Sequence, residues 1–88
     1  MAIIMPGDAK VLKSYGFTEN HLDPLRFRKR INNFVYTIHF RSEIGWRFSF
    51  INISNMKKMN EFYFKTLKEA LDEFEKISKE KANESETN

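Results

Sequence analysis

The sequence predicts an α+β fold, in which an antiparallel sheet meander of three or four strands packs on a C-terminal helix and follows a short N-terminal helix. Three runs between Leu25 and Ile53 alternate between apolar and polar residues, which is the period of a strand with one buried face. Farther along, apolar residues recur from Leu67 to Ile77 at the spacing of one helix face. The length of 88 residues allows one domain, residues 1–81, and we expect residues 82–88 to form a flexible polar tail.

The N-terminal part predicts a helix followed by a break. Asp8 is a suitable N-cap for a helix through Tyr15, and Gly16 is a natural residue to end it. Thr18 is expected to cap one further helical turn over residues 19–22. The chain must then become extended, because the residue before a proline, here Asp23, is disfavoured in the helical conformation.

The first two runs, residues 25–31 and 34–41, predict a β-hairpin. The Asn32-Asn33 pair between them suits a two-residue type I′ turn, because asparagine tolerates positive φ better than most residues. Such a turn fixes the register and sets Phe27 opposite Ile38. One face of the hairpin is then nearly all apolar and is expected to pack on the core.

The third run, residues 46–53, is expected to pair with the second. A three-residue loop, Glu43-Ile44-Gly45, keeps the apolar side chains on one face and gives Gly45 the left-handed position of a G1 bulge. This register would place Arg41 opposite Arg47. Like charges that face each other are mildly destabilising, so the arrangement has a cost unless an anion meets it.

Two short segments could add a strand, and one long segment predicts a helix. Residues 2–5 are apolar and suit an edge strand or a segment packed on the core, whereas residues 62–64 suit a short fourth strand after a polar connection over residues 54–60. Thr66 and Glu69 have the spacing of a capping box at a helix start. The apolar stripe of this helix consists of Leu67, Ala70, Leu71, Phe74 and Ile77.

All five arginines of the chain fall on the outer face of the predicted sheet, whereas the ten lysines are scattered. Arginine makes bidentate hydrogen bonds to phosphate, so this face is a candidate nucleic-acid-binding surface. A solvated outer face would show the same alternation, and Val35, Ile51 and Ile53 add an apolar patch at the other end of this face. The candidate binding residues are Arg26, Arg28, Arg30, Thr37, His39, Arg41, Arg47 and Ser49.

Charge and composition limit the function classes. The net charge is +3, with ten Lys/Arg against four Asp/Glu in residues 1–60 and five against eight in residues 61–88, so the body attracts anions. The chain contains no cysteine, which excludes disulfides and thiolate zinc sites. His21 and His39 lack metal-ligand spacing, and Glu43 has no partner carboxylate nearby. We therefore expect no catalytic residue, no metal and no cofactor; stacking of bases on Tyr36 or Trp46 is a minor alternative.

The segment Phe64-Lys65-Thr66-Leu67-Lys68-Glu69-Ala70 after three strands resembles the start of the helix in the small DNA-binding domain of phage-type tyrosine integrases and its AP2-like relatives. The resemblance covers residues 25–80, although a helix precedes the sheet in this chain. In that family the exposed sheet face enters the major groove. The resemblance therefore implies that the five arginines face DNA.

Two other resemblances extend the range of functions. The order helix, three strands, helix is similar to a double-stranded-RNA-binding domain, but the Asn32-Asn33 loop is shorter than the corresponding loop of that family. The size and the Lys/Asn/Phe-rich composition resemble small proteins of phages and mobile elements. Many of those proteins bind and inhibit a host protein, including anti-defence inhibitors.

The sequence thus favours a small, basic, non-enzymatic nucleic-acid-binding module, with DNA ahead of RNA. The alternative is a phage or mobile-element protein that binds and inhibits a host protein through the same face or through the Val35, Ile51 and Ile53 patch; a homodimer could also cover that patch. An enzyme ranks third. No stretch approaches the length of a membrane span or of a signal peptide, so we expect a cytoplasmic protein that does not contact a membrane.

Overall fold

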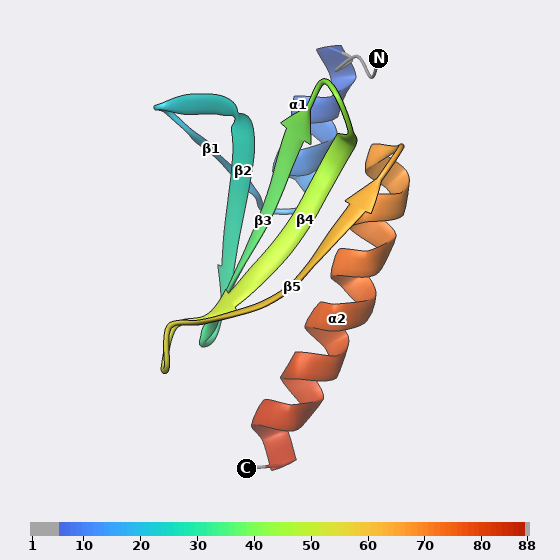
Figure 1. Cartoon of the computed structure of the whole chain (residues 1–88). Coiled ribbons are helices and arrows are strands. Elements are labelled where there is room, and N and C mark those ends of the chain that lie inside the picture. Colours follow the sequence, from blue (N-terminus) through green and yellow to red (C-terminus); the bar gives the residue numbers. More distant parts are fainter. Residues whose placement is uncertain (1–5, 88) are drawn as a thin grey trace.

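The computed structural model describes residues 6–87, and it describes their side chains except at residues 6, 57–60 and 83–87. The expected strand at residues 2–5 lies outside the described residues. The elements follow one another as α1 (Pro6–Ser14), β1 (Thr18–Asn20), β2 (Asp23–Ile31), β3 (Phe34–Arg41), β4 (Gly45–Asn52), β5 (Lys57–Phe64) and α2 (Leu67–Thr87) (Figure 1).

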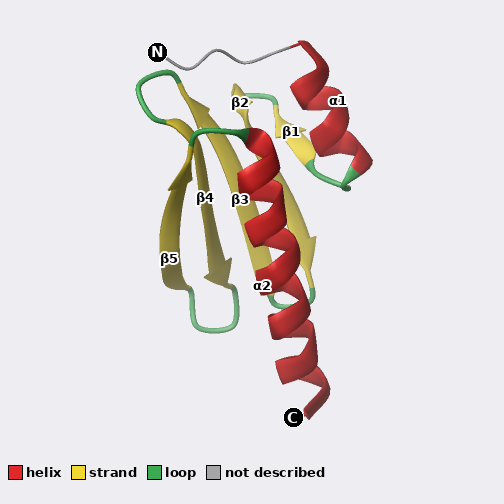
Figure 2. Ribbon diagram, turned by 90° about the vertical axis from the view of Figure 1, so that its right-hand side faces the viewer, coloured by secondary structure: helices red, strands yellow, loops and turns green. Residues whose placement is uncertain are grey.

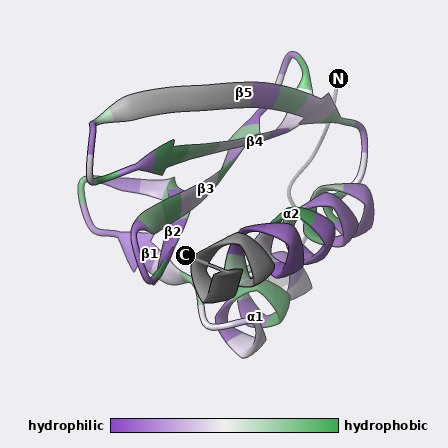
Figure 3. Cartoon of the chain, turned by 90° about the horizontal axis from the view of Figure 1, so that it is seen from below, coloured by the Kyte–Doolittle hydropathy of each residue, from purple (hydrophilic) through white to green (hydrophobic). Residues whose placement is uncertain are grey.

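Over residues 6–87 the fold has two layers, an antiparallel sheet and a pair of helices. In this part of the chain the sheet has five strands in the order β1-β2-β3-β4-β5, so every strand pairs with its neighbour in the sequence. Both helices lie on the same side of the sheet, with α2 running across the central strands and α1 beside it (Figures 2 and 3). The predicted α+β class is confirmed, but the expected three or four strands are wrong, because the sheet gains a strand at each edge.

The strand β1 replaces the helical turn that the sequence predicted over residues 19–22. Thr18 does not cap a helix; its hydroxyl donates a hydrogen bond to the carbonyl oxygen of Arg28 at 3.3 Å. The chain then reverses through a local turn in which the side chain of Asn20 accepts a hydrogen bond from the backbone N–H of Leu22 at 2.9 Å. Pairing with the edge of β2 is therefore preferred to an isolated turn of helix.

The strand β5 is longer than expected, because it begins at Lys57 rather than at Phe62. It pairs with β4 through Trp46 opposite Phe64 and Phe48 opposite Phe62, so its two phenylalanines extend the apolar face of the sheet. The polar segment that was expected to be a connection over residues 54–60 therefore forms a turn only in its first part. Backbone pairing to β4 provides the hydrogen bonds that make a polar strand possible here.

The hairpin of β2 and β3 has the predicted register. Phe27 lies opposite Ile38, Arg28 opposite Thr37 and Arg26 opposite His39. The two-residue turn is confirmed, but only Asn32 has a positive φ, of 54°. A type I′ turn requires positive φ at both central residues, so the turn type was predicted wrongly.

The hairpin of β3 and β4 is shifted by two residues from the prediction. The loop is Ser42–Ile44, so Arg41 pairs with Gly45 and Phe40 with Trp46. The predicted register would have set Trp46 opposite Ser42 and the two arginines opposite each other. In the observed register the rings of Phe40 and Trp46 meet edge to face with centroids 5.0 Å apart. A shift of two residues leaves each side chain on its predicted face, because side chains alternate with period two.

The two helices cover the apolar face much as predicted. The start of α2 is stabilised by Thr66, whose hydroxyl oxygen accepts a hydrogen bond from the backbone N–H of Glu69 at 3.3 Å and donates one to its carboxylate at 2.9 Å. This pairing satisfies one free donor at the helix start and forms one half of the predicted capping box; the Glu69 carboxylate accepts from the Thr66 hydroxyl, whereas in the complete motif it accepts from a backbone N–H. The helix α2 continues to Thr87, through the segment predicted as a tail. Its predicted stripe is buried against the sheet, as is Leu12 of α1.

The conformation of Gly45 gives a test of the loop between β3 and β4. Its φ is +114°, and an added Cβ would lie 2.6 Å from the carbonyl oxygen of Phe64. We expect Gly45→Ala to lower the free energy of unfolding by about 2 kcal/mol or more, and the Tm by roughly 8 °C or more. Gly7→Ala is the control, since a Cβ at Gly7 meets no atom within 4 Å. Equal thermal unfolding curves for the two variants would contradict this account of the loop.

Candidate functional site

The sheet face that the helices leave uncovered carries all the residues that the sequence predicted for binding. We call it the arginine face; its members come from β2, β3 and β4. The register aligns them in rows across the sheet, with Arg26, His39 and Arg47 in one row and Arg28, Thr37 and Ser49 in the next. The arginine face consists of Arg26, Arg28, Arg30, Thr37, His39, Arg41, Arg47 and Ser49.

The imidazole of His39 lies at the centre of this face between two arginines. Its Nε2 is 3.1 Å from Oδ2 of Asp23, and only 11% of its side chain is exposed. The other ring nitrogen, Nδ1, is buried and forms no hydrogen bond with the described residues, and the same holds for the Nε atoms of Arg26 and Arg47. Buried polar atoms without partners cost free energy, on the order of 1–3 kcal/mol each.

The surroundings of His39 favour its neutral form. Burial lowers its pKa from the ordinary value of about 6.5, and the positive charges of Arg26, Arg47 and Arg41 act in the same direction. The carboxylate of Asp23 raises the pKa, with an effect smaller than that of burial but larger than that of any one of the three arginines. Nε2 of His39 thus lies within hydrogen-bond distance of Asp23, whereas Nδ1 is buried.

The positive charge of the face is only partly compensated. Asp23 lies against His39, and Glu61 of β5 approaches Arg47 at 3.9 Å while accepting a hydrogen bond from the hydroxyl of Tyr63 at 2.9 Å. Arg28 and Arg41 are exposed, and neither forms an ion pair with any described side chain. These two guanidinium groups are therefore free to bind an anion from solution.

A shallow depression lies at the end of the face where β1 meets β2. Its volume is about 240 Å³, and it is lined by Thr18, Arg28, Lys29, Arg30, Val35 and Ile53. Val35 pairs with Ile51, and the backbone N–H of Ile53 donates to the carbonyl oxygen of Asn33 at 2.8 Å, which holds Ile53 beside β3. The apolar patch predicted from the sequence is therefore assembled, and two arginines border it.

Several residues of the site were not found from the sequence. Asp23, Glu61 and Tyr63 contact the arginine face, and Thr18 lines its depression. The alternation of Glu61-Phe62-Tyr63-Phe64 was the available signal for β5, since it places Glu61 and Tyr63 on the outer face. The proposed stacking of bases on Tyr36 or Trp46 is wrong, because both rings are buried, with 0% and 3% exposed.

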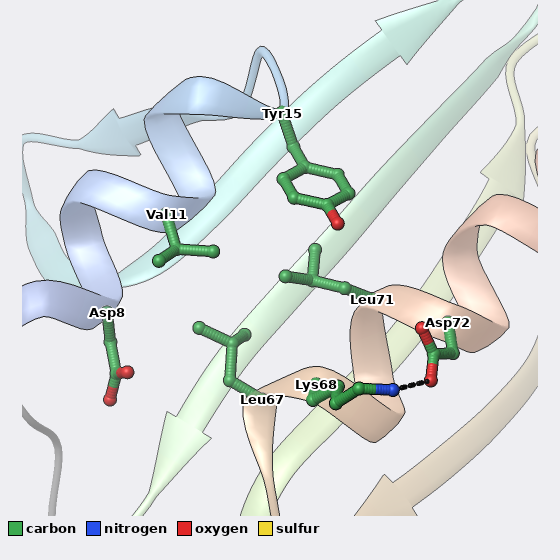
Figure 4. A pocket seen from close by; sticks show the side chains of 7 residues that line it. All are labelled: Asp8, Val11, Tyr15, Leu67, Lys68, Leu71 and Asp72. Carbon is green, nitrogen blue, oxygen red and sulfur yellow. Dashed lines mark hydrogen bonds and ion pairs between the residues drawn. The ribbon is translucent and has the colours of Figure 1, made fainter.

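A second cavity lies between the two helices, on the opposite side of the molecule. It has a volume of about 270 Å³, and Val11 of α1 points toward Leu67 and Leu71 of α2 across it (Figure 4). At its rim, Lys68 forms an ion pair with Asp72 at 3.0 Å. The charges here are already paired, and the apolar side chains belong to the contact between the helices, so this cavity is a weaker candidate site than the arginine face.

Comparisons with known proteins gave no match, so any inference about function rests on the geometry of the structure. No protein-family model matches the chain, and neither the curated proteins nor the solved structures that were searched gave a match. Among the described residues, no group of three His, Cys, Asp or Glu side chains could hold a metal ion. The two helices, over the same residues, contain no stretch long and apolar enough to cross a membrane.

The burial of His39 predicts a pH dependence of stability. Because its pKa is lower in the folded than in the unfolded protein, the unfolded state binds more protons near pH 6, and stability falls as the pH drops through the ordinary histidine range. We expect wild-type protein to lose more of its free energy of unfolding between pH 7.5 and 5.5 than His39→Gln does, measured by urea denaturation. His21→Gln, at an exposed position, should keep the wild-type slope. The same slope in His39→Gln and wild type would contradict the prediction.

Proposed function

We propose that the chain is a non-enzymatic nucleic-acid-binding module that contacts phosphates through the arginine face. One observation carries the proposal: the strand registers place all five arginines on one face of the sheet, and both described helices lie on the other side of the sheet (Figure 3). Guanidinium groups bind phosphate oxygens with two parallel hydrogen bonds, and their charge displaces the counterions of a nucleic acid. The lysines, by contrast, are distributed over both layers.

The spacing of the arginines supports a repeating anion as the ligand. Arg26, Arg28 and Arg30 occupy alternate positions of β2, so their Cα atoms are roughly 6.6 Å apart along the strand. A polyanion can meet several of them at once, whereas a single small anion would meet one or two. Thr37 and Ser49 lie in the row of Arg28 and add hydroxyl groups that can donate to phosphate oxygens.

The central histidine supports binding rather than catalysis. A general base needs a nitrogen that substrate can reach, and Nδ1 of His39 is buried while Nε2 is directed to Asp23. The position of His39 between Arg26 and Arg47 suits a role in spacing the two guanidinium groups. We therefore assign the face to recognition and not to a reaction.

A protein partner is the second candidate, because the outer face also carries half-buried apolar side chains. Val35, Ile51 and Ile53 adjoin Arg28 and Arg30, which is the mixture of apolar centre and arginine rim typical of protein interfaces. An inhibitor of a host protein would use such a surface. Its binding would change little with salt, whereas contacts to phosphates weaken steeply between about 50 and 200 mM salt.

A paired charge removal tests the proposal. In Arg28→Gln with Arg41→Gln, two exposed guanidinium groups without ion pairs to described residues are lost, so the Tm should stay within about 2 °C of wild type. The slope of log K against log salt concentration should fall by roughly 1.4 to 1.8. Fluorescence anisotropy with single-stranded and double-stranded oligonucleotides at several salt concentrations measures the slope, and thermal unfolding followed by circular dichroism measures the Tm.

The matched control removes the same charge from the opposite layer. Lys76 and Lys79 are exposed on α2, and changing both to Gln should leave the affinity and the salt slope near the wild-type values. If both double variants weaken binding equally, the effect comes from net charge, and the arginine face has no special role.

A further inference from the structure

The width of the arginine face limits the form of nucleic acid that it can accept. The sheet has five strands, and neighbouring strands lie about 4.8 Å apart, so the axes of its edge strands are separated by roughly 19 Å. The major groove of B-DNA is about 12 Å wide and admits a helix or a two-stranded ribbon. The flanking strands β1 and β5 therefore hinder insertion of the arginine-bearing strands into a groove.

The acidic residue at one edge of the sheet also disfavours a duplex. Glu61 lies on β5 beside Arg47, and a duplex laid across the whole face would bring its phosphates against this carboxylate. A single strand that follows β2 avoids it, since two strands, β3 and β4, lie between β5 and the strand that carries Arg26, Arg28 and Arg30. Such a path leads from the row of His39 to the depression at the far end of the face.

The depression has the chemistry of a nucleotide site. Arg28 and Arg30 are exposed at its rim, and Val35 and Ile53 are half-buried within it. The guanidinium of Arg30 is held by a hydrogen bond from its Nε to the carbonyl oxygen of Asn32 at 3.0 Å. A phosphate can bind the guanidinium groups while the flat base of the same nucleotide covers the apolar side chains. A base inside a duplex cannot do this, because it is stacked and paired.

We infer that the depression lined by Arg28, Arg30, Val35 and Ile53 holds one unpaired nucleotide, and that the ligand of the arginine face is single-stranded nucleic acid. This inference rests on the proposed function and adds the form of the ligand and the place of a base. The phosphates of the strand follow β2, and the base at the depression lies over Val35 and Ile53. DNA and RNA share this chemistry.

The test compares three fluorescein-labelled probes of 16 nucleotides on the 88-residue chain at 50 mM salt. They are oligo-dT, a strand of the same length in which abasic sites keep the phosphates but remove the bases, and a duplex. We expect oligo-dT to bind about fivefold or more tighter than the abasic strand and also tighter than the duplex. The RNA strand oligo-U, measured in parallel, identifies the preferred sugar.

The second part of the experiment changes the two apolar residues of the depression. Val35→Thr with Ile53→Thr keeps β-branched side chains but reduces the apolar surface, so the preference for oligo-dT over the abasic strand should disappear while the salt slope stays unchanged. Ile44→Thr is the control, because Ile44 is an apolar residue exposed in the loop Ser42–Ile44, away from the depression. It should keep the preference. If the double variant fails to fold, the comparison of the three probes on the wild-type protein still tests whether a base contributes to binding.

The outcomes separate this inference from the proposed function. Equal affinity for oligo-dT and the abasic strand, or a duplex bound as tightly as oligo-dT, overturns the nucleotide site but leaves phosphate binding intact. Absence of binding to every probe at 50 mM salt overturns the proposed function itself and the inference with it.

Discussion

The ring of Phe74 is the contact on which the arrangement of the two layers depends. It meets Tyr36 edge to face with centroids 5.2 Å apart, and it meets Phe17 in the same way at 4.9 Å. Tyr36 lies on the central strand β3, and Phe17 lies between α1 and β1. One side chain of α2 thus ties the sheet and the N-terminal segment together. Because this apolar contact fixes which face the helix covers, it also determines which face the arginines present to solvent.

The faces of the strands could be predicted from the sequence, and the edges of the sheet could not. Alternation assigns every arginine to one side, and a register error of two residues between β3 and β4 does not change that assignment. The register itself depended on the pairing of Phe40 with Trp46, which the loop sequence alone does not specify. The strand β1 is only three residues long and lacks the pattern of a half-buried strand, and β5 begins with polar residues, so only its end, residues 62–64, was predicted as a strand.

For the candidate site, too, the sequence predicts what depends on local alternation and does not predict contacts between segments that are far apart in the chain. The eight predicted residues lie on one face because side chains alternate between the two faces along each strand. The acidic residues beside them, Asp23 at the start of β2 and Glu61 on β5, could not be placed there from the alternation of the three predicted runs. On the inner face, Lys29 is an example of a residue whose position could be predicted but whose contacts could not. Its position opposite Tyr36 was predicted, yet its ammonium donates to the carbonyl oxygen of Tyr15 at 2.7 Å and lies 5.7 Å from the centre of the Phe74 ring. Those partners belong to segments far along the chain, which periodicity cannot place.

The order of the strands has a consequence for folding kinetics. Every strand pairs with the strand that precedes or follows it, so each hairpin closes a short loop and loses little chain entropy. Proteins dominated by such local contacts fold faster than sheets with long crossovers. The docking of Phe17 against Phe74 joins residues much farther apart in the sequence than the hairpins do. The meander is therefore expected to form first, and the closing of α1 and α2 over it to complete the native state.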